Sequence, residues 1–88
     1  MIIEFDPDKA AINLAKHGIS FEEASTALYD EQALAMEDAS SESEHRWILI
    51  GMSNQLRLLT VIYTLREPDI IRLISARRAT KREMSNYA

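Results

Sequence analysis

The sequence predicts one α+β domain over residues 1–88, in which a strand and two helices precede an antiparallel sheet and a last helix. Three observations support this prediction. The chain has 88 residues, the size of one small domain. Apolar residues recur at helical spacing between residues 10 and 28. Residues 46–76 are instead rich in Ile, Leu, Val, Thr, Tyr and Trp, and short connections divide them into strands.

A short strand and a helix come first. Residues 2–5 form an apolar run that predicts the strand. Asp6 can cap a helix, and Pro7 suits its first position. Residues 16–18 are Lys-His-Gly, which place cations in the last turn and a glycine where the left-handed closing conformation is needed. The first helix is therefore expected to end there.

A second helix is predicted to begin after Ser20. Ser20 can cap it, and Glu23 three residues later completes a capping box. Apolar residues continue at helical spacing as far as Leu28. Residues 38–44 are polar and acidic, which is typical of a solvated loop.

Three strands follow this loop, over residues 46–52, 57–65 and 70–76. Their connections are short enough for hairpins, so the strands should be antiparallel neighbours. Residues 33–36 can add another strand, which makes the predicted sheet three- to four-stranded. Residues 80–83, Thr-Lys-Arg-Glu, form a second capping box and predict a short final helix.

Composition excludes several classes of protein. The chain has no cysteine, so a disulfide framework, a zinc ribbon and a thiol nucleophile are all excluded. The apolar runs are too short to cross a bilayer, and the first residues do not resemble a signal peptide, so we expect a cytoplasmic protein. No cofactor and no metal site are expected, because the acidic residues lack His or Cys at ligand spacing.

The net charge of −4 is divided unequally along the chain. Residues 1–56 contain three Lys or Arg against eleven Asp or Glu, a net charge of −8. Residues 57–88 contain seven against three, a net charge of +4. The total argues against a nucleic-acid partner, but the basic part can still engage phosphate.

Arginines are expected to meet at one end of the sheet. Arg57 begins one strand, and Arg77 and Arg78 end the next antiparallel strand, so the three share an end in any register. Because like charges repel unless an anion joins them, this cluster indicates a phosphate site. Lys81 and Arg82 follow in the first turn of the last helix, where cations are disfavoured. The alternative is that these cations are solvated or paired with the acids of the first half.

The other end of the sheet collects Arg46, Arg66 and Arg72. Which of the three share a face depends on the register, because a slip of one residue exchanges the two faces.

Four stretches carry a resemblance to a known family: FDPDKA (5–10), KHGISFEEA (16–24), RLL (57–59) and IRLISARRAT (71–80). Together they resemble the BrnT toxins of bacterial type II toxin–antitoxin systems. Phe5 stands where the family often has Trp, which keeps an aromatic residue there.

The resemblance implies a fold similar to RelE-type ribonuclease toxins. It implies a toxin that cleaves RNA, inhibits growth and is held inactive by a BrnA-like antitoxin. That antitoxin would carry a ribbon-helix-helix part, so operator DNA would be contacted only through the antitoxin.

Cleavage of RNA without a metal needs a 2′-hydroxyl to attack the adjacent phosphate, proton transfer at both oxygens, and cations around the phosphorane. Arg57, Arg77 and Arg78 are the expected catalytic cations. The residues expected to bind RNA are Lys81, Arg82, Arg72 and Arg46. Tyr87, by analogy with RelE-type toxins, and His17 are the candidates for proton transfer. His17 can instead bind the last carbonyls of its helix, and Tyr87 can instead pack back on the sheet.

Two other functions compete with a ribonuclease. A helix-turn-helix DNA binder over residues 10–28 is disfavoured, because its second helix is acidic and would be repelled by phosphate. A non-catalytic interaction or regulatory subunit of a DNA-binding complex remains an open alternative.

Overall fold

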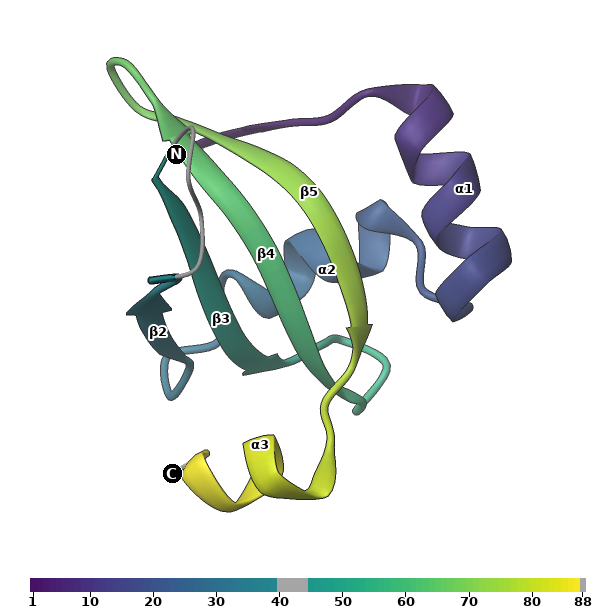
Figure 1. Ribbon diagram of the computed structural model, residues 1–88, viewed down its shortest axis with the longest axis vertical. Helices are drawn as coiled ribbons and strands as arrows, with labels where there is room; N and C mark the ends of the chain where they lie inside the picture. The colour runs from purple at the N-terminus through teal and green to yellow at the C-terminus, as the bar shows by residue number, and fades with distance from the viewer. Residues whose placement is uncertain (40–44, 88) are drawn as a thin grey trace.

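The computed structural model describes residues 1–39 and 45–87, and its centre is a five-stranded sheet with helices at one face and at one end (Figure 1). Within these residues no helix is long and apolar enough to cross a membrane. The elements in chain order are β1 (Ile2–Glu4), α1 (Pro7–His17), α2 (Phe21–Ala27), β2 (Leu34–Glu37), β3 (Arg46–Met52), β4 (Leu58–Arg66), β5 (Ile70–Arg78) and α3 (Lys81–Asn86).

The predicted ends of α1 are confirmed. The Asp6 carboxylate accepts a hydrogen bond of 2.9 Å from the backbone N–H of Asp8, and Pro7 occupies the first helical position. Gly18 closes the helix at φ 72°, where a side chain would strain the backbone. Most of the predicted acidic loop, residues 40–44, lies outside the described residues.

The sheet has the strand order β1-β5-β4-β3-β2 and is mixed. The meander β2 to β5 is antiparallel, and the additional strand predicted before the acidic loop is present as β2. β1 joins the sheet too, parallel to β5, with Ile2 opposite Ile70. The expected RelE-like sheet of three to four antiparallel strands is therefore corrected to five mixed strands. Hairpin signals reveal only neighbours in sequence, whereas β1 finds a partner 68 residues away.

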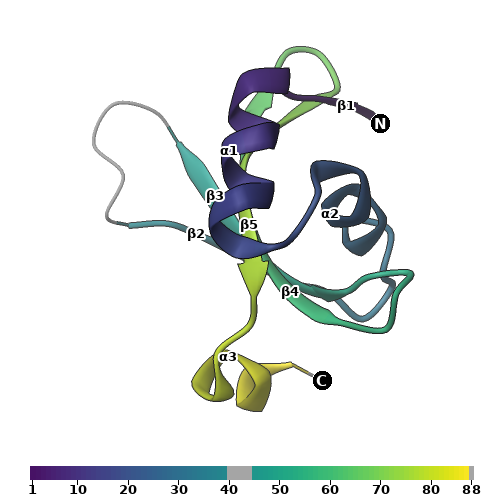
Figure 2. The same cartoon turned by 90° about the vertical axis from the view of Figure 1, so that its right-hand side faces the viewer.

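α1 and α2 cover the same face of the sheet, called the helix face below (Figure 2). α2 packs against β3, β4 and β5, whereas α1 lies along β5. The opposite face is called the open face. A bulge at Ile74 separates the pair Ile62–Ser75 from the pair Tyr63–Leu73, so that one extra residue stands in β5.

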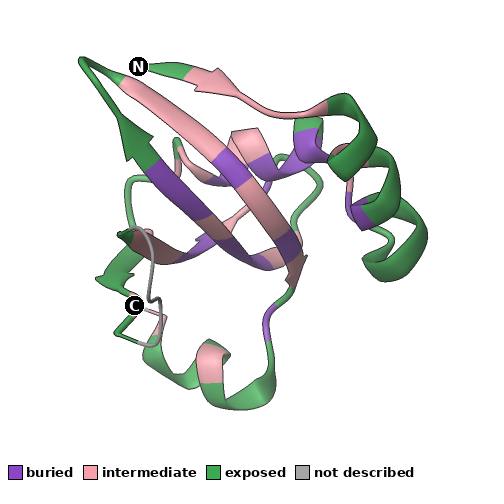
Figure 3. Ribbon diagram, turned by 45° about the horizontal axis from the view of Figure 1, so that its top comes forward, coloured by how far each residue is buried: buried purple, intermediate pink, exposed green. Residues whose placement is uncertain are grey.

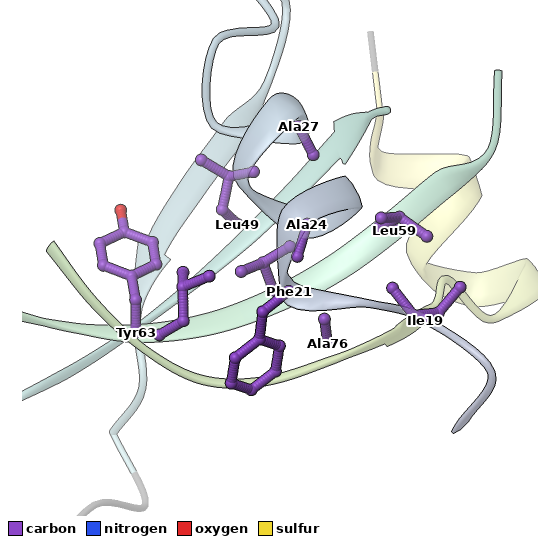
Figure 4. Packing of buried hydrophobic residues seen from close by; sticks show 10 residues of the cluster. Ile19, Phe21, Ala24, Ala27, Leu49, Leu59, Tyr63 and Ala76 are labelled. Carbon is purple, nitrogen blue, oxygen red and sulfur yellow. The ribbon is translucent and has the colours of Figure 1, made fainter. Parts of the chain in front are cut away.

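The hydrophobic core lies between α2 and the helix face (Figure 4). Phe21 and Ile19 are fully buried, and the Phe21 ring meets Phe5 edge to face with 5.3 Å between centroids. Gly51 permits the close approach of α2, because a Cβ there would stand 2.7 Å from the Ala27 carbonyl oxygen. The remaining members are Ala24, Ala27, Leu49, Leu59, Val61, Tyr63, Leu73 and Ala76.

α1 is joined to this framework mainly by the polar residue Asn13. Asn13 is the buried residue of α1, whereas most of the helix surface is exposed (Figure 3). Its amide nitrogen donates to the carbonyl oxygens of Ile19 and Ala76, each at 2.9 Å. Its amide oxygen accepts from the backbone N–H of Ala76 at 3.1 Å. The two bonds with Ala76 fix α1 beside β5, and the bond to Ile19 holds the connection to α2 against the end of α1.

Replacing Asn13 with alanine should lower the free energy of unfolding by about 2 kcal/mol, because three buried backbone groups lose their partner. Urea denaturation measures the loss. Leu14→Ala is the control, because the neighbouring Leu14 is 51% exposed and should cost much less. Equal losses for the two variants would show that the amide contributes nothing particular.

Candidate functional site

The buried Glu23 and the half-buried Arg57 form an ion pair at the end of the sheet where β4 begins. Ser20 caps α2 as predicted, with its hydroxyl accepting from the Glu23 N–H at 3.0 Å. The predicted capping box is only half formed, however, because the Glu23 carboxylate turns inward. It accepts from Arg57 Nε at 2.9 Å, from Arg57 Nη2, and from the Ser53 hydroxyl at 2.7 Å. A carboxylate binds a guanidinium through two parallel hydrogen bonds more strongly than it binds one backbone N–H. Glu23 therefore pairs with Arg57 and leaves the capping box incomplete.

The Arg57 guanidinium lowers the pKa of Glu23 below its usual value. Burial acts in the opposite direction, and the Ser53 hydroxyl adds to the lowering. The Glu23 side chain is 1% exposed, whereas Arg57 is 27% exposed. The pKa of Arg57 is raised by the same pair. Arg57 is thus a cation held in place by Glu23, which partly neutralises its charge, while the rest of its guanidinium group is exposed to water.

A second ion pair holds α3 at the same end of the sheet. Arg77 Nη1 and Nη2 donate to the two carboxylate oxygens of Glu83 at 2.7 and 2.9 Å. The buried Thr60 hydroxyl donates to Glu83 Oε1 at 2.9 Å. The predicted capping box is confirmed, since Glu83 Oε1 accepts from Thr80 N and the Thr80 hydroxyl accepts from Glu83 N. Glu83 therefore joins the start of α3 to β4 and β5.

These contacts lower the pKa of Glu83 from 4.5 to about 2, with Arg77 as the largest cause and burial opposing it. A carboxyl whose pKa falls on folding contributes stability above its unfolded pKa and loses it as the pH falls toward its folded pKa. We therefore expect α3 to detach progressively between pH 4.5 and pH 2. Amide resonances of Glu83 and Met84 followed by NMR measure this change.

The Glu83→Gln variant is the control for the acid transition. It should show a loosened α3 at neutral pH and no further change of these resonances in the acid range. An α3 that stays docked in the original protein down to pH 2 would contradict the prediction.

The structure places Arg57, Arg77 and Arg78 at one end of the sheet, as predicted, but not on one face. Arg78 lies opposite Leu59 on the helix face, and its charge contributes to the lowered pKa of Glu23. Arg77 lies on the open face with Glu83. Consecutive strand residues point to opposite faces, so the sheet divides the cluster. Two of these arginines already have an anionic partner within the chain, because Arg57 pairs with Glu23 and Arg77 pairs with Glu83. Lys81 and Arg82 are exposed in the first turn of α3.

At the other end of the sheet the register assembles a row on the open face. Arg46 and Arg72 are both direct neighbours of Thr64, so all three point to one face. Arg72 is paired with Glu4 at 2.6 Å. The Thr64 hydroxyl is buried, and no hydrogen-bond partner for it exists among the described residues. Sequence reasoning missed Thr64, although its place two residues before Arg66 in a strand puts both on one face.

Tyr87 and His17, the candidates for proton transfer, lie in different places. The Tyr87 hydroxyl donates to Asp30 Oδ2, which also accepts from Met52 N at 2.8 Å. This bond raises the pKa of Tyr87, and Met52 N is the largest cause of the lowered pKa of Asp30. Tyr87 thus packs back on the body of the protein. His17 is exposed in the last turn of α1 and lines a pocket between α1 and β5.

Within residues 1–39 and 45–87, no three His, Asp or Glu side chains gather closely enough to hold a metal ion. The described site consists of hydroxyls and cations on a sheet, many of them guanidinium groups. The class of protein that these residues define is a small α+β domain with arginines at both ends of one sheet, three of which pair with carboxylates.

Comparison with known proteins specifies this class. The family described as "Ribonuclease toxin, BrnT, of type II toxin-antitoxin system" matches residues 5–83, and the chain belongs to this family. The crystal structure of the Brucella abortus ribonuclease toxin BrnT is similar, with a TM-score of 0.71 and 28% sequence identity. The similarity covers 92% of this chain and 99% of that one. No curated protein matches the chain. Membership of a type II family implies an antitoxin protein as partner.

Proposed function

We propose that this chain is a toxin that cleaves RNA without a metal ion, acting in the cytoplasm to inhibit translation and growth. Family membership supports the reaction class. The observation that carries the proposal is the set of arginines on the open face, with Arg77 at one end and Arg46 and Arg72 beside a buried hydroxyl at the other. A strand of RNA crossing this face would meet cations along its course.

Arg77 is the cation we assign to the scissile phosphate. It uses three of its five N–H donors on Glu83 and on the Arg78 carbonyl, which leaves two for phosphate oxygens. The 2′-hydroxyl would attack the adjacent phosphorus while its proton passes to a base, and the departing 5′-oxygen would take a proton from an acid. Guanidinium donors would stabilise the charge that develops on the phosphorane.

The remaining predicted residues have subsidiary roles in this proposal. Arg57 and Arg78 would contact the RNA at the helix-face rim, and Lys81 and Arg82 would extend the path over α3. Tyr87 and His17 remain the candidates for proton transfer, and for Tyr87 this requires release from Asp30.

The partner that we propose is a BrnA-like antitoxin with a ribbon-helix-helix part, through which operator DNA would be bound. The charge of −8 on residues 1–56 favours a basic protein surface as the contact.

The decisive experiment incubates the purified protein with RNA in the presence of EDTA. We expect cleavage of the RNA, and growth arrest when the protein is expressed without its antitoxin. Intact RNA under these conditions would contradict the enzymatic proposal.

One observation favours a second function, that of a non-catalytic regulatory subunit. Two of the three expected catalytic arginines, Arg57 and Arg77, are neutralised by carboxylates of the chain itself. Intact RNA together with repression of the operon by the complex would support this second function.

A further inference from the structure

A pocket of about 190 Å³ lies between α1 and β5 and is called the α1–β5 pocket. Three of its lining residues are basic and two belong to the bulged part of the strand. These five are Lys9, Lys16, His17, Ile74 and Ser75. The pocket is separate from the ion pairs of Arg57 and Arg77, which involve other residues.

The helix geometry explains why the cations line this pocket. Asn13 is bonded to Ala76 of β5, which fixes the face that α1 turns toward the strand. Residues four before and three after a given position share its helix face, so Lys9 and Lys16 flank Asn13. On the strand side, the bulge places an extra residue, Ile74, beside the helix.

The basic groups of the pocket form no ion pair with the residues that the structure describes. Arg57, Arg72 and Arg77 each pair with a carboxylate, but in the described part of the chain no ion pair involves Lys9, Lys16 or His17. Lys16 and His17 suit the last turn of α1, where the helix dipole favours cations. Lys9 stands in the first turns, where the dipole disfavours it. The helix dipole therefore explains the positions of Lys16 and His17, but it does not explain that of Lys9.

The size of the pocket limits its ligand. Pockets that enclose a drug-sized molecule measure about 300–1,000 Å³, so a pocket of about 190 Å³ suits a single charged group. Its cations match the oxygens of a phosphate. Ser75 pairs with Ile62 and lies two residues before Arg77 on the same strand, about 7 Å along it.

We propose that the α1–β5 pocket binds a phosphate of the RNA strand next to the phosphate held by Arg77. This inference rests on the proposed function, because it takes the phosphate to be part of the RNA substrate. The pocket would then fix the direction in which RNA passes from the open face over β5 toward α1.

The test measures binding of a fluorescent 2′-O-methyl RNA oligonucleotide, which cannot be cleaved, as a function of salt concentration. Lys9→Gln and Lys16→Gln each remove one cation and keep a good helix former. Each single variant should lower the slope of log K against log[salt] by about 0.7, and the double variant by about 1.4. Lys9→Arg and Lys16→Arg are the matched controls, because each changes the same side chain, keeps its charge and a good helix former, and should leave the slope unchanged.

An unchanged slope in the double variant would overturn the inference, and so would an equal loss of slope in the two arginine controls. A parallel NMR titration with inorganic phosphate distinguishes the sources of the anion. Inorganic phosphate could change the NMR chemical shifts of Lys9 and Lys16 while the salt dependence of RNA binding stays the same in the double variant. This result would assign the pocket to free phosphate and overturn the RNA inference. Because the oligonucleotide cannot be cleaved, an inactive but RNA-binding protein would contradict the proposed function alone.

Discussion

Replacing Arg77 with alanine should reduce RNA cleavage by about 100- to 1,000-fold, the loss typical of removing one donor to a developing oxyanion. Three of the five N–H groups of Arg77 are bonded to Glu83 and to the Arg78 carbonyl. The other two are the donors that we assign to the phosphate, and alanine removes them. Single-turnover cleavage of a short RNA measures the effect. Arg77→Lys should recover only part of the loss, because an ammonium cannot form the two parallel bonds of a guanidinium.

The control separates chemistry from the docking of α3. Glu83→Ala breaks the same ion pair and loosens the same helix, but it leaves the guanidinium in place. We expect this variant to cleave RNA within a few-fold of the original protein. If Glu83→Ala loses as much activity as Arg77→Ala, the role of Arg77 is to hold α3 and its assignment to the phosphate is wrong.

Replacing Glu23 with alanine should give a large loss of stability. The carboxylate is 1% exposed and is bonded to Arg57 and Ser53, so its removal breaks a buried charge network. We expect a cost of about 3 kcal/mol, at the lower end for such pairs because the remaining Arg57 charge reaches water. For a domain of this size the melting temperature should fall by about 10–20 °C.

Glu22→Gln is the matched control, because it removes the same charge one residue earlier from an exposed side chain. Its melting temperature should stay within a few degrees of the original. The lowered pKa of Glu23 also means that its stabilisation is present at neutral pH and is lost as the pH falls below the usual range of a carboxyl. Loss of stability in Glu23→Ala that persists unchanged at acid pH would contradict the ion-pair explanation.

The parts of the fold that short-range chemistry determines were predictable. Asp6 with Pro7, Gly18, and Thr80 with Glu83 mark element ends, and the structure confirms each of them. β1 was predicted as a strand, but its parallel pairing with β5 was not, because no local signal in three residues specifies a partner so distant in sequence. The bulge at Ile74 was likewise invisible, since periodicity over a few residues does not reveal one extra residue.

The sequence predicted at which end of the sheet the arginines lie, but not which carboxylates they pair with. Antiparallel pairing alone placed Arg57 and Arg77 at one end of the sheet, in agreement with the register. Their partners Glu23 and Glu83 both had capping positions in the sequence. Glu83 performs that role and pairs with Arg77 as well, whereas Glu23 abandons it for Arg57. The difference arises from burial, which only the packing of α2 on the sheet decides.

The side chain of Asn13 has a consequence beyond holding α1 in place. A primary amide carries the same donor and acceptor as a peptide group. Asn13 therefore takes the place, beside Ala76, of one residue of a strand that would continue β1 along the edge of β5. β1 pairs with β5 only as far as Arg72, and beyond that point the backbone of β5 would otherwise offer its hydrogen-bonding groups to another chain. We therefore expect this amide to protect the edge of β5 from strand addition, so that a chain without it should self-associate as well as lose stability.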